Sequence, residues 1–261
     1  MIEFEQVGRL EPIGEGALFV SNRDEMLGII RNSLKTKEKN GHGAGPRTLP
    51  PPLEGVMPEI PPEELADRFE TELKNLGCNV HHASSGPKLK DLLCSILTQS
   101  QAASVVLSRN PILSQLKINR MLEGQGIKVV EWPAGGSEQP ESRSFSDDCF
   151  AAGAGITGVD FALAETGSLV LTSFTEGSQL TSLAPPVHIA LYRRSQLRAT
   201  LDEVLKELPV SRDPARPSPA RSLVFVSGTS RTADIEQILV RGVHGPGSVH
   251  AILVEDSCLA E

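Results

Sequence analysis

Apolar residues recur at two spacings along the chain, and these alternate from residue 62 onward. Apolar positions three or four residues apart predict amphipathic helices, whereas short unbroken apolar runs predict buried strands. The predicted helices are 62–76, 89–97, 110–122 and 201–208, and the predicted strands are 78–81, 103–107, 127–132, 187–192, 223–226 and 249–254. Because strand and helix alternate with short connections, we expect an α/β fold with an open, mostly parallel sheet and helices on both faces.

Residues that favour helix ends support this pattern. Gly77 follows the last apolar position of the first predicted helix and is a plausible C-cap. Asn110, followed by a proline, is a good N-cap for the helix that runs through Leu122. Ser144 is predicted to cap a further helix that carries two aspartates in its first turn.

The first sixty residues differ from the rest. Residues 1–22 show no clear hydrophobic periodicity. In residues 24–34 the apolar positions lie on one face of a helix, but a helix this short is stable only when it packs against another part of a protein. Residues 35–61 are rich in Lys, Gly and Pro and predict a linker. We therefore expect an N-terminal extension with a short helix (1–34), a linker (35–61) and one domain (62–261).

Composition and charge narrow the range of partners. The net charge of −8 and the pI near 5.4 argue against a nucleic-acid partner or an anionic membrane surface. Only nine aromatic residues accompany Trp132, too few for a base-stacking platform. The chain has no apolar run of about 18 residues, and its N-terminus lacks a basic region followed by an apolar core. We expect a cytoplasmic protein without a membrane span.

Cysteine and histidine positions predict no metal centre. The cysteines are Cys78, Cys94, Cys149 and Cys258. They form no C-x-x-C pair, which argues against a zinc ribbon or an iron–sulfur site, so reduced and mostly buried thiols are expected. The adjacent His81 and His82 point to opposite faces of a strand and cannot chelate one metal together. His188 lies in an apolar run and is interpreted as a core or edge histidine. We expect no resident cofactor.

A polar segment after the strand 223–226 is the first candidate for a binding site. Its candidate ligand-binding residues are Ser227, Gly228, Thr229, Ser230, Arg231, Thr232 and Asp234. The apolar stripe that follows, at Ile235, Ile238 and Leu239, predicts a helix. A turn that opens a helix directs backbone N–H groups and a positive helix end at an anion, and Arg231 adds a planar charge. The alternative is an ordinary turn in which Thr232 is an N-cap and Arg231 pairs with a carboxylate.

A second polar segment, Glu165-Thr166-Gly167, lies between the apolar arms 159–164 and 168–171. Gly167 fits a hairpin turn that requires a positive φ angle, and Thr166 and Gly167 are candidate ligand contacts. Glu165 is a candidate general base, nucleophile or hydrogen-bond acceptor. The alternative is that Glu165 accepts backbone N–H bonds and holds the turn.

A third segment, Gly242–Gly247, supplies two more candidates, His244 as a proton relay and Gly245 as a ligand contact. Loops at strand ends of an open α/β sheet converge on one crevice. We therefore expect the three segments to form one anion site, with Glu165 and His244 as its catalytic candidates.

Five blocks, taken in order, resemble the LUD-domain family and, within it, the lactate-utilization branch. These blocks are Gly155–Gly158, Ala164–Val170, Leu183–Ile189, Ser227–Glu236 and Gly242–Pro246. The resemblance covers about residues 62–256. It implies a fold like that of the sugar-phosphate isomerase and CoA-transferase group. It also implies a part in the oxidation of L-lactate to pyruvate, alongside an iron–sulfur subunit and a Cys-rich oxidoreductase subunit.

Three functions are compatible with these observations. The favoured one is a non-redox subunit of a lactate-oxidising complex that binds a small carboxylate or phosphate. The second is a stand-alone enzyme acting on a CoA ester, a sugar phosphate or a folate, with Glu165 as nucleophile or base. The third is a scaffold in which the glycine motifs are purely structural.

Overall fold

The computed structural model describes residues 25–32, 59–133, 141–208, 222–233 and 239–259. Internal contacts divide the chain into two units, Met1–Met57 and Pro58–Glu261. The described part of the first unit is a helix over 25–32. The second unit carries the sheet and every site described below. No described helix is long and apolar enough to cross a membrane.

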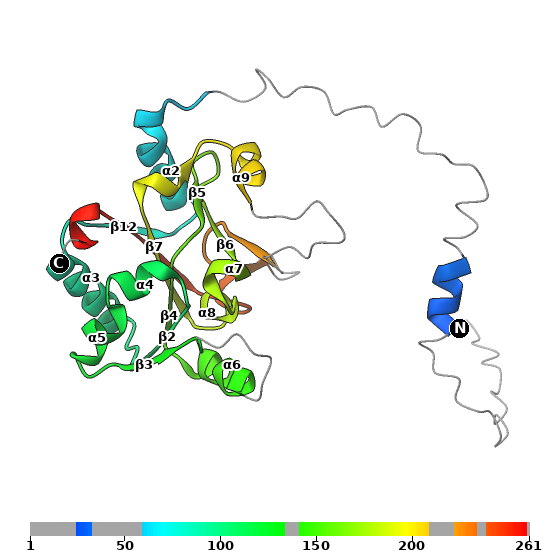
Figure 1. The fold of residues 1–261 in the computed structure, drawn as a ribbon, viewed down its shortest axis with the longest axis horizontal. Coiled ribbons are helices and arrows are strands. Elements are labelled where there is room, and N and C mark those ends of the chain that lie inside the picture. Colours follow the sequence, from blue (N-terminus) through cyan, green and yellow to red (C-terminus); the bar gives the residue numbers. More distant parts are fainter. Residues whose placement is uncertain (1–24, 33–58, 134–140, 209–221, 234–238, 260–261) are drawn as a thin grey trace, which may run out of the picture. The chain divides into compact units, whose positions relative to one another are not determined.

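A six-stranded sheet with all neighbours parallel forms the centre of the second unit (Figure 1). In spatial order its strands are β1 (Asn79–Ala83), β12 (Ser248–Val254), β7 (Val187–Tyr192), β4 (Ala154–Thr157), β2 (Ser104–Leu107) and β3 (Lys128–Glu131). Strands β4 and β7 are buried along their whole length, as expected for strands covered on both faces. The predicted α/β fold with a mostly parallel sheet is confirmed.

Three helices cover one face of this sheet: α3 (Gly86–Gln99), α4 (Pro111–Gln115) and α5 (Ile118–Glu123). Asn110 caps α4 as predicted, because its side chain accepts the N–H of Ile112 at 3.1 Å. The predicted helix through Leu122 is interrupted, however. Lys117 has a left-handed φ of 53° between α4 and α5, and the break lets both Ile118 and Leu122 reach the core.

The other face is covered by helix α2 (Leu65–Asn75), helix α6 (Glu141–Ala151) and a second, four-stranded sheet. This sheet has the order β8 (Leu197–Arg198), β5 (Phe161–Leu163), β6 (Ser168–Thr172) and β9 (Leu223–Val226). Gly77 follows α2 with a φ of 81°, which agrees with its predicted place at the helix end. The prediction that Ser144 caps a helix is wrong, since α6 begins three residues earlier, at Glu141.

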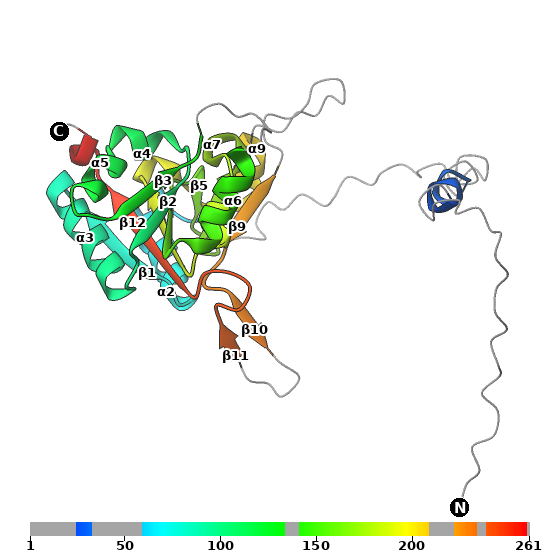
Figure 2. The same ribbon diagram turned by 90° about the horizontal axis from the view of Figure 1, so that it is seen from below.

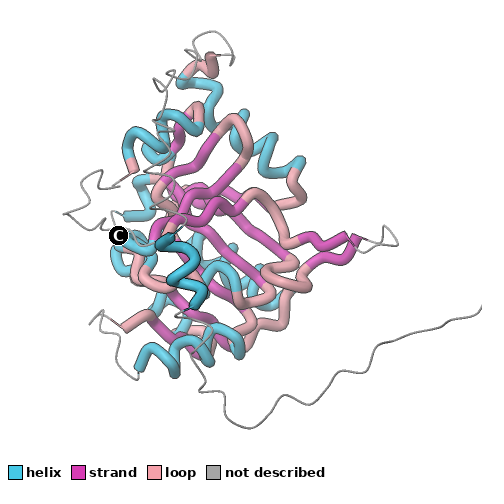
Figure 3. Tube along the Cα trace, turned by 90° about the vertical axis from the view of Figure 1, so that its right-hand side faces the viewer, coloured by secondary structure: helices cyan, strands magenta, loops and turns pink. Residues whose placement is uncertain are grey.

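The segment after residue 222 departs most from expectation. Strand β9 pairs antiparallel with β6 and alternates between exposed and half-buried positions, so it is not a buried strand of the main sheet. The predicted helix starting near Thr232 is also wrong. Instead, β10 (Arg231–Ala233) and β11 (Leu239–Arg241) pair antiparallel as a hairpin that projects from the body of the domain (Figures 2 and 3). Residues 234–238 lie outside the described residues.

The remaining described elements are short. They are helices α7 (Ser173–Glu176), α8 (Leu180–Leu183) and α9 (Leu201–Glu207), and the 3-10 turns η1 (Pro62–Glu64), η2 (Arg194–Gln196) and η3 (Asp256–Leu259). Helix α9 confirms the prediction for 201–208, and the antiparallel pair β5–β6 confirms the two apolar arms.

Candidate functional site

The structure brings the three predicted polar segments into contact. The hydroxyl of Ser168 lies 2.6 Å from that of Ser227 and 2.8 Å from that of Thr166, which joins the first segment to the second. The backbone N–H of Ser230 donates to the carbonyl of Pro246 at 2.9 Å, which joins the first segment to the third. These contacts hold the segments together by hydroxyl and backbone groups.

Arg231 binds a helix end. Its guanidinium donates to the carbonyl oxygen of Leu76, at the C-terminal end of α2, where positive charge is favoured. Gly228, with a φ of 105°, packs against the same carbonyl, so a Cβ there would lie 2.9 Å from it. The partner of Arg231 is therefore a carbonyl and not the carboxylate considered from the sequence.

Glu165 also has a structural contact. Its Oε1 accepts the N–H of Leu201 at 3.0 Å, at the first turn of α9, while its Oε2 is buried without a hydrogen-bond partner. A carboxylate is stabilised at a helix N-terminus by the unpaired N–H groups and the helix dipole. Gly167 has the predicted positive φ, 62°, and a Cβ there would meet the backbone N of Leu73 at 2.5 Å. The contact of Glu165 is the one expected if it holds the turn.

The positions of the other predicted site residues neither support nor oppose a role in ligand binding. Thr232 belongs to β10 and caps no helix, and Asp234 lies outside the described residues. His244 is exposed, and Gly245 packs against Ser230. The hydroxyl of Thr229 is buried without a hydrogen-bond partner. The roles assigned to these residues from the sequence stay predictions.

A different place in the fold has the geometry of a ligand site. Strands β2 and β4 are neighbours, but the chain leaves β2 toward β3 and leaves β4 toward β7, in opposite directions. Ligands of open α/β sheets bind at such a switch point, beyond the carboxyl ends of the strands. The loops after β2 and β4 touch here, since a Cβ on Gly158 would lie 2.3 Å from the side chain of Asn110.

A buried carboxyl group lies at this switch point. Glu176, the last residue of α7, is 1% exposed. The Ser108 hydroxyl donates to its Oε2 at 2.6 Å and the Asn110 amide donates to its Oε1, while the Thr175 hydroxyl oxygen lies 3.3 Å from Oε1. Burial raises the pKa of Glu176 to about 7, although the Ser108 and Asn110 donors act in the opposite direction.

Asp160 is the second carboxyl group of this cluster. Its Oδ2 accepts the backbone N–H of Thr172 at 2.6 Å and the hydroxyl of Thr175 at 2.9 Å. Burial raises the pKa of Asp160, and the hydrogen bonds from Thr175 and Thr172 partly offset that rise. Among the described residues, neither Asp160 nor Glu176 forms an ion pair with a lysine or arginine.

A pocket of about 580 Å³ adjoins Glu176 at the carboxyl ends of β2 and β3. Ser108 and Asn110 line it together with three basic side chains, Arg109, Lys117 and Arg120. Its other polar lining residues are Ser114, Asn119, Glu131 and Trp132. The Arg109 guanidinium is anchored by the carbonyl of Phe174 at 2.5 Å, whereas Lys117 and Arg120 form no ion pair within the described part of the chain. The excess of positive charge suits an anion.

The sequence contained only weak signals for this site. Ser108-Arg109-Asn110 follows a predicted strand, where a crevice is expected, but the proline after Asn110 indicates only a helix cap. Glu176 lies in a polar stretch without hydrophobic periodicity. The contacts of Glu176 join α7 to the loop after β2, with Ser108 lying 68 residues away in sequence, and no local sequence pattern predicts such a contact.

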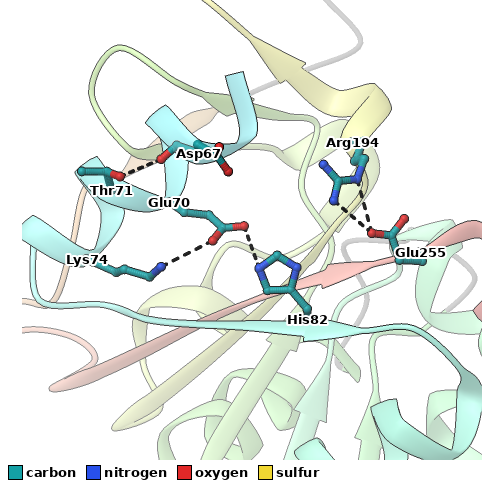
Figure 4. A network of polar contacts seen from close by, with 7 residues as sticks. All are labelled: Asp67, Glu70, Thr71, Lys74, His82, Arg194 and Glu255. Carbon is teal, nitrogen blue, oxygen red and sulfur yellow. Dashed lines mark hydrogen bonds and ion pairs between the residues drawn. The ribbon is translucent and has the colours of Figure 1, made fainter. Parts of the chain in front are cut away.

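His81 and His82 point to opposite faces of β1, as predicted, and His188 lies in the core. His82 forms an ion-pair contact of 2.8 Å with Glu70 of α2 (Figure 4), whereas His81 contacts His250 at 3.0 Å on the opposite face of β1. His188 is buried and bonds the hydroxyl of Thr157 at 2.8 Å. The described residues contain no group of three or more metal-type ligands. Three of the four cysteines, Cys78, Cys149 and Cys258, are buried.

The parallel six-stranded sheet, with a second sheet packed on one face, defines an α/β protein. The chain belongs to the LUD domain family, whose model matches residues 66–254. It is similar to lactate utilization protein C of Halalkalibacterium halodurans, with 28% identity over 91% of this chain and 96% of that protein. It is equally similar to lactate utilization protein C of Bacillus subtilis, with 28% identity over 91% of this chain and 98% of that protein.

A solved structure supports the fold. The crystal structure of a DUF162 family protein from Deinococcus radiodurans is 24% identical in sequence and superimposes with a TM-score of 0.53. The match covers 76% of this chain and all of the other. At this identity the likeness is evidence for the fold alone.

Proposed function

We propose that the chain serves in L-lactate utilization as a non-redox subunit that binds a small carboxylate or phosphate in the pocket beyond β2 and β3. The names of its relatives point to the process. The observation that carries the binding role is the set of three basic side chains, Arg109, Lys117 and Arg120, in one pocket beside the switch point.

Size and charge favour a small organic anion. A volume of about 580 Å³ falls within the range of small-molecule sites. The chain as a whole carries a net charge of −8, so a local cluster of cations requires a particular reason. Basic groups in a concave site attract anions and raise their local concentration.

Oxidation of L-lactate to pyruvate removes two electrons and two protons from the substrate. In this proposal the electrons pass to partner subunits, one with iron–sulfur centres and one rich in cysteine. The chain itself contributes anion binding, and its four separated cysteines are not arranged as cluster ligands.

The binding role can be tested by growth on L-lactate. In a strain of the native host that lacks this chain, the wild type should restore growth, whereas the double variant Lys117→Met/Arg120→Gln should restore it poorly. Lys128→Met removes an exposed charge outside the pocket and should behave as the wild type. Full growth with the double variant, present at normal abundance, would refute the binding role.

The assembly role needs a separate measurement. A tagged wild-type chain, purified gently from cells grown on L-lactate, should carry an iron–sulfur protein with it. If mass spectrometry repeatedly detects no such partner, the chain does not act as a subunit of a lactate-oxidising complex.

A stand-alone enzyme is the second candidate, favoured by one observation. The Ser108 hydroxyl, 2.6 Å from a buried carboxylate, has the arrangement of a nucleophile and its base. Attack on an acyl-CoA thioester would move the hydroxyl proton to Glu176, form a Ser108 ester and expel the CoA thiolate, which would then take that proton back from Glu176 to leave as the thiol. Mass spectrometry of the Ser108 peptide after incubation with acetyl-CoA tests this, and an unmodified peptide speaks against it.

A further inference from the structure

The surroundings of Glu176 contain polar donors and no direct cation. The loop after β2 presents Ser108 and Asn110, α7 presents Thr175, and the loop after β4 presents the carboxyl group of Asp160. Arg109 contributes only its backbone N–H, which donates to the carbonyl of Glu176 at 3.1 Å. The charged groups on the pocket side are Arg109, Lys117, Arg120 and Glu131.

The hydroxyl of Ser108 has one hydrogen, and the charge state of Glu176 decides where it points. When Glu176 is ionised, both of its oxygens only accept, so Ser108 donates its hydrogen to Oε2. The oxygen of Ser108 also faces the backbone N–H of Asn110 at 3.4 Å. In this state Ser108 presents no hydrogen to the pocket that it lines.

Protonation of Glu176 reverses that bond. A proton on Oε2 donates to the Ser108 oxygen, whose two acceptor positions are then used by Glu176 and by the N–H of Asn110. The Ser108 hydrogen becomes free to turn toward an acceptor in the pocket. Burial raises the pKa of Glu176 to about 7, so both states are populated near neutral pH.

We propose that Glu176 takes up one proton when an anion occupies the basic pocket, and that Ser108 then donates its hydrogen bond to an acceptor oxygen of that anion. This inference rests on the proposed function. It specifies the ligand as an anion with a carboxylate, oxo or phosphate-type oxygen that can accept a hydrogen bond beside the groups that hold its charge. The coupling also removes the repulsion between an ionised Glu176 and the bound anion.

Proton uptake makes the affinity depend on pH in a defined direction. If only the protonated form binds, affinity follows the protonated fraction of Glu176 and decreases about tenfold from pH 6 to pH 8. Binding at pH 8 should take up about one proton per anion, and binding at pH 6 about a tenth of one. Neither lysine nor arginine changes charge in this range.

The experiment is isothermal titration calorimetry of the full chain with sodium L-lactate, sodium pyruvate and sodium sulfate. Each titration is made at pH 6 and pH 8 in buffers of different ionisation enthalpy, which gives the protons taken up without any variant. Sulfate replaces phosphate because it does not titrate in this range. Tighter binding of lactate or pyruvate than of sulfate identifies a carboxylate ligand, and the reverse order identifies a phosphate-type ligand.

Glu176→Gln separates the coupling from binding itself. Its amide can donate to Ser108 and accept from Asn110, as the protonated acid would, so the variant should bind equally well at pH 6 and pH 8 without proton uptake. Glu123→Gln makes the same change at an exposed position of α5 outside the pocket and should keep the tenfold dependence.

The outcomes distinguish the two proposals. Binding to the wild type with no proton uptake and no pH dependence overturns the role of Glu176 and leaves the anion pocket intact. Absence of binding by all three anions at both pH values overturns the anion pocket, and the coupling with it. Proton uptake that persists in Glu176→Gln overturns the assignment to Glu176.

Discussion

Glu165 and Glu176 are two carboxylates of one chain whose surroundings give them different roles. Glu165 accepts one backbone N–H at the start of α9, a contact that ties the turn to that helix. Glu176 is surrounded by side-chain donors, is 1% exposed and lacks an ion-pair partner among the described residues. Environment, and not residue type, makes Glu176 the better candidate for proton chemistry.

Replacement of Glu165 tests whether it is structural. Glu165→Ala removes the acceptor for the Leu201 N–H and should lower the free energy of unfolding by about 1 kcal/mol, as for other lost helix caps. Glu165→Gln keeps an acceptor oxygen and should cost less. Urea denaturation measures both, and both variants should support growth on L-lactate. Loss of growth in a fully stable Glu165→Gln protein would restore the catalytic interpretation.

At the residue scale, backbone conformation could be predicted from the sequence, whereas contacts between distant residues could not. Gly167 was predicted to need a positive φ, and it has one, because a glycine between two apolar arms is a local signal. The partner of Arg231 could not be predicted, because the Leu76 carbonyl lies 155 residues away in the chain. The meeting of Ser108, Asn110 and Glu176 depends on tertiary structure in the same way.

At the scale of elements, short apolar runs predict β2, β3, β7 and β12, and helical apolar spacing predicts α2, α3 and α9. The central strand β4 was not predicted, because Gly155 and Thr157 interrupt its apolar run. The run 223–226 predicted a buried strand because all four residues are apolar. That prediction is wrong, since Leu223 and Phe225 are exposed on strand β9. The break at Lys117 carries neither glycine nor proline. Tertiary packing sets it, so the sequence predicted one helix where two exist.

Close packing between β4 and α8 offers a test of the fold. A Cβ on Gly155 would lie 1.8 Å from the carbonyl oxygen of Thr181, so Gly155→Ala forces two backbones apart. We expect it to lower the free energy of unfolding by about 3 kcal/mol. Gly247→Ala, whose nearest neighbour would be at an ordinary 3.5 Å, is the matched control. Equal stability of the two variants in urea denaturation would contradict this packing.

At the scale of the whole molecule, buried titratable groups make stability depend on pH. Burial lowers the pKa of His188 to about 4, with a smaller contribution from His250. The unfolded chain, with a histidine pKa near 6.5, binds more protons between these values, so stability is lost as the pH falls from 6.5 to 4. Glu176 acts oppositely: its raised pKa adds stability at low pH that is lost as the pH rises from 4.5 to 7.

Substitution of His188 isolates its contribution. His188→Gln should reduce the loss of stability between pH 6.5 and pH 4 by about 3 kcal/mol relative to the wild type, because burial holds the His188 pKa at about 4 in the folded protein. His244→Gln removes an exposed imidazole and should leave the pH profile unchanged. Urea denaturation across this range gives the profiles, and parallel curves for His188→Gln and the wild type would show that His188 does not titrate on unfolding.

The central claim is that the basic pocket beyond β2 and β3 holds a small anion, and its most direct test is a binding titration. Sodium pyruvate and sodium L-lactate are titrated at pH 6 into the wild type, into Lys117→Met/Arg120→Gln and into Lys128→Met. We expect saturable one-to-one binding to the wild type and to Lys128→Met. Affinity should be about tenfold weaker in the double variant, since each exposed cation contributes at most about 1 kcal/mol. Equal affinity in all three proteins would place the anion elsewhere and contradict the claim.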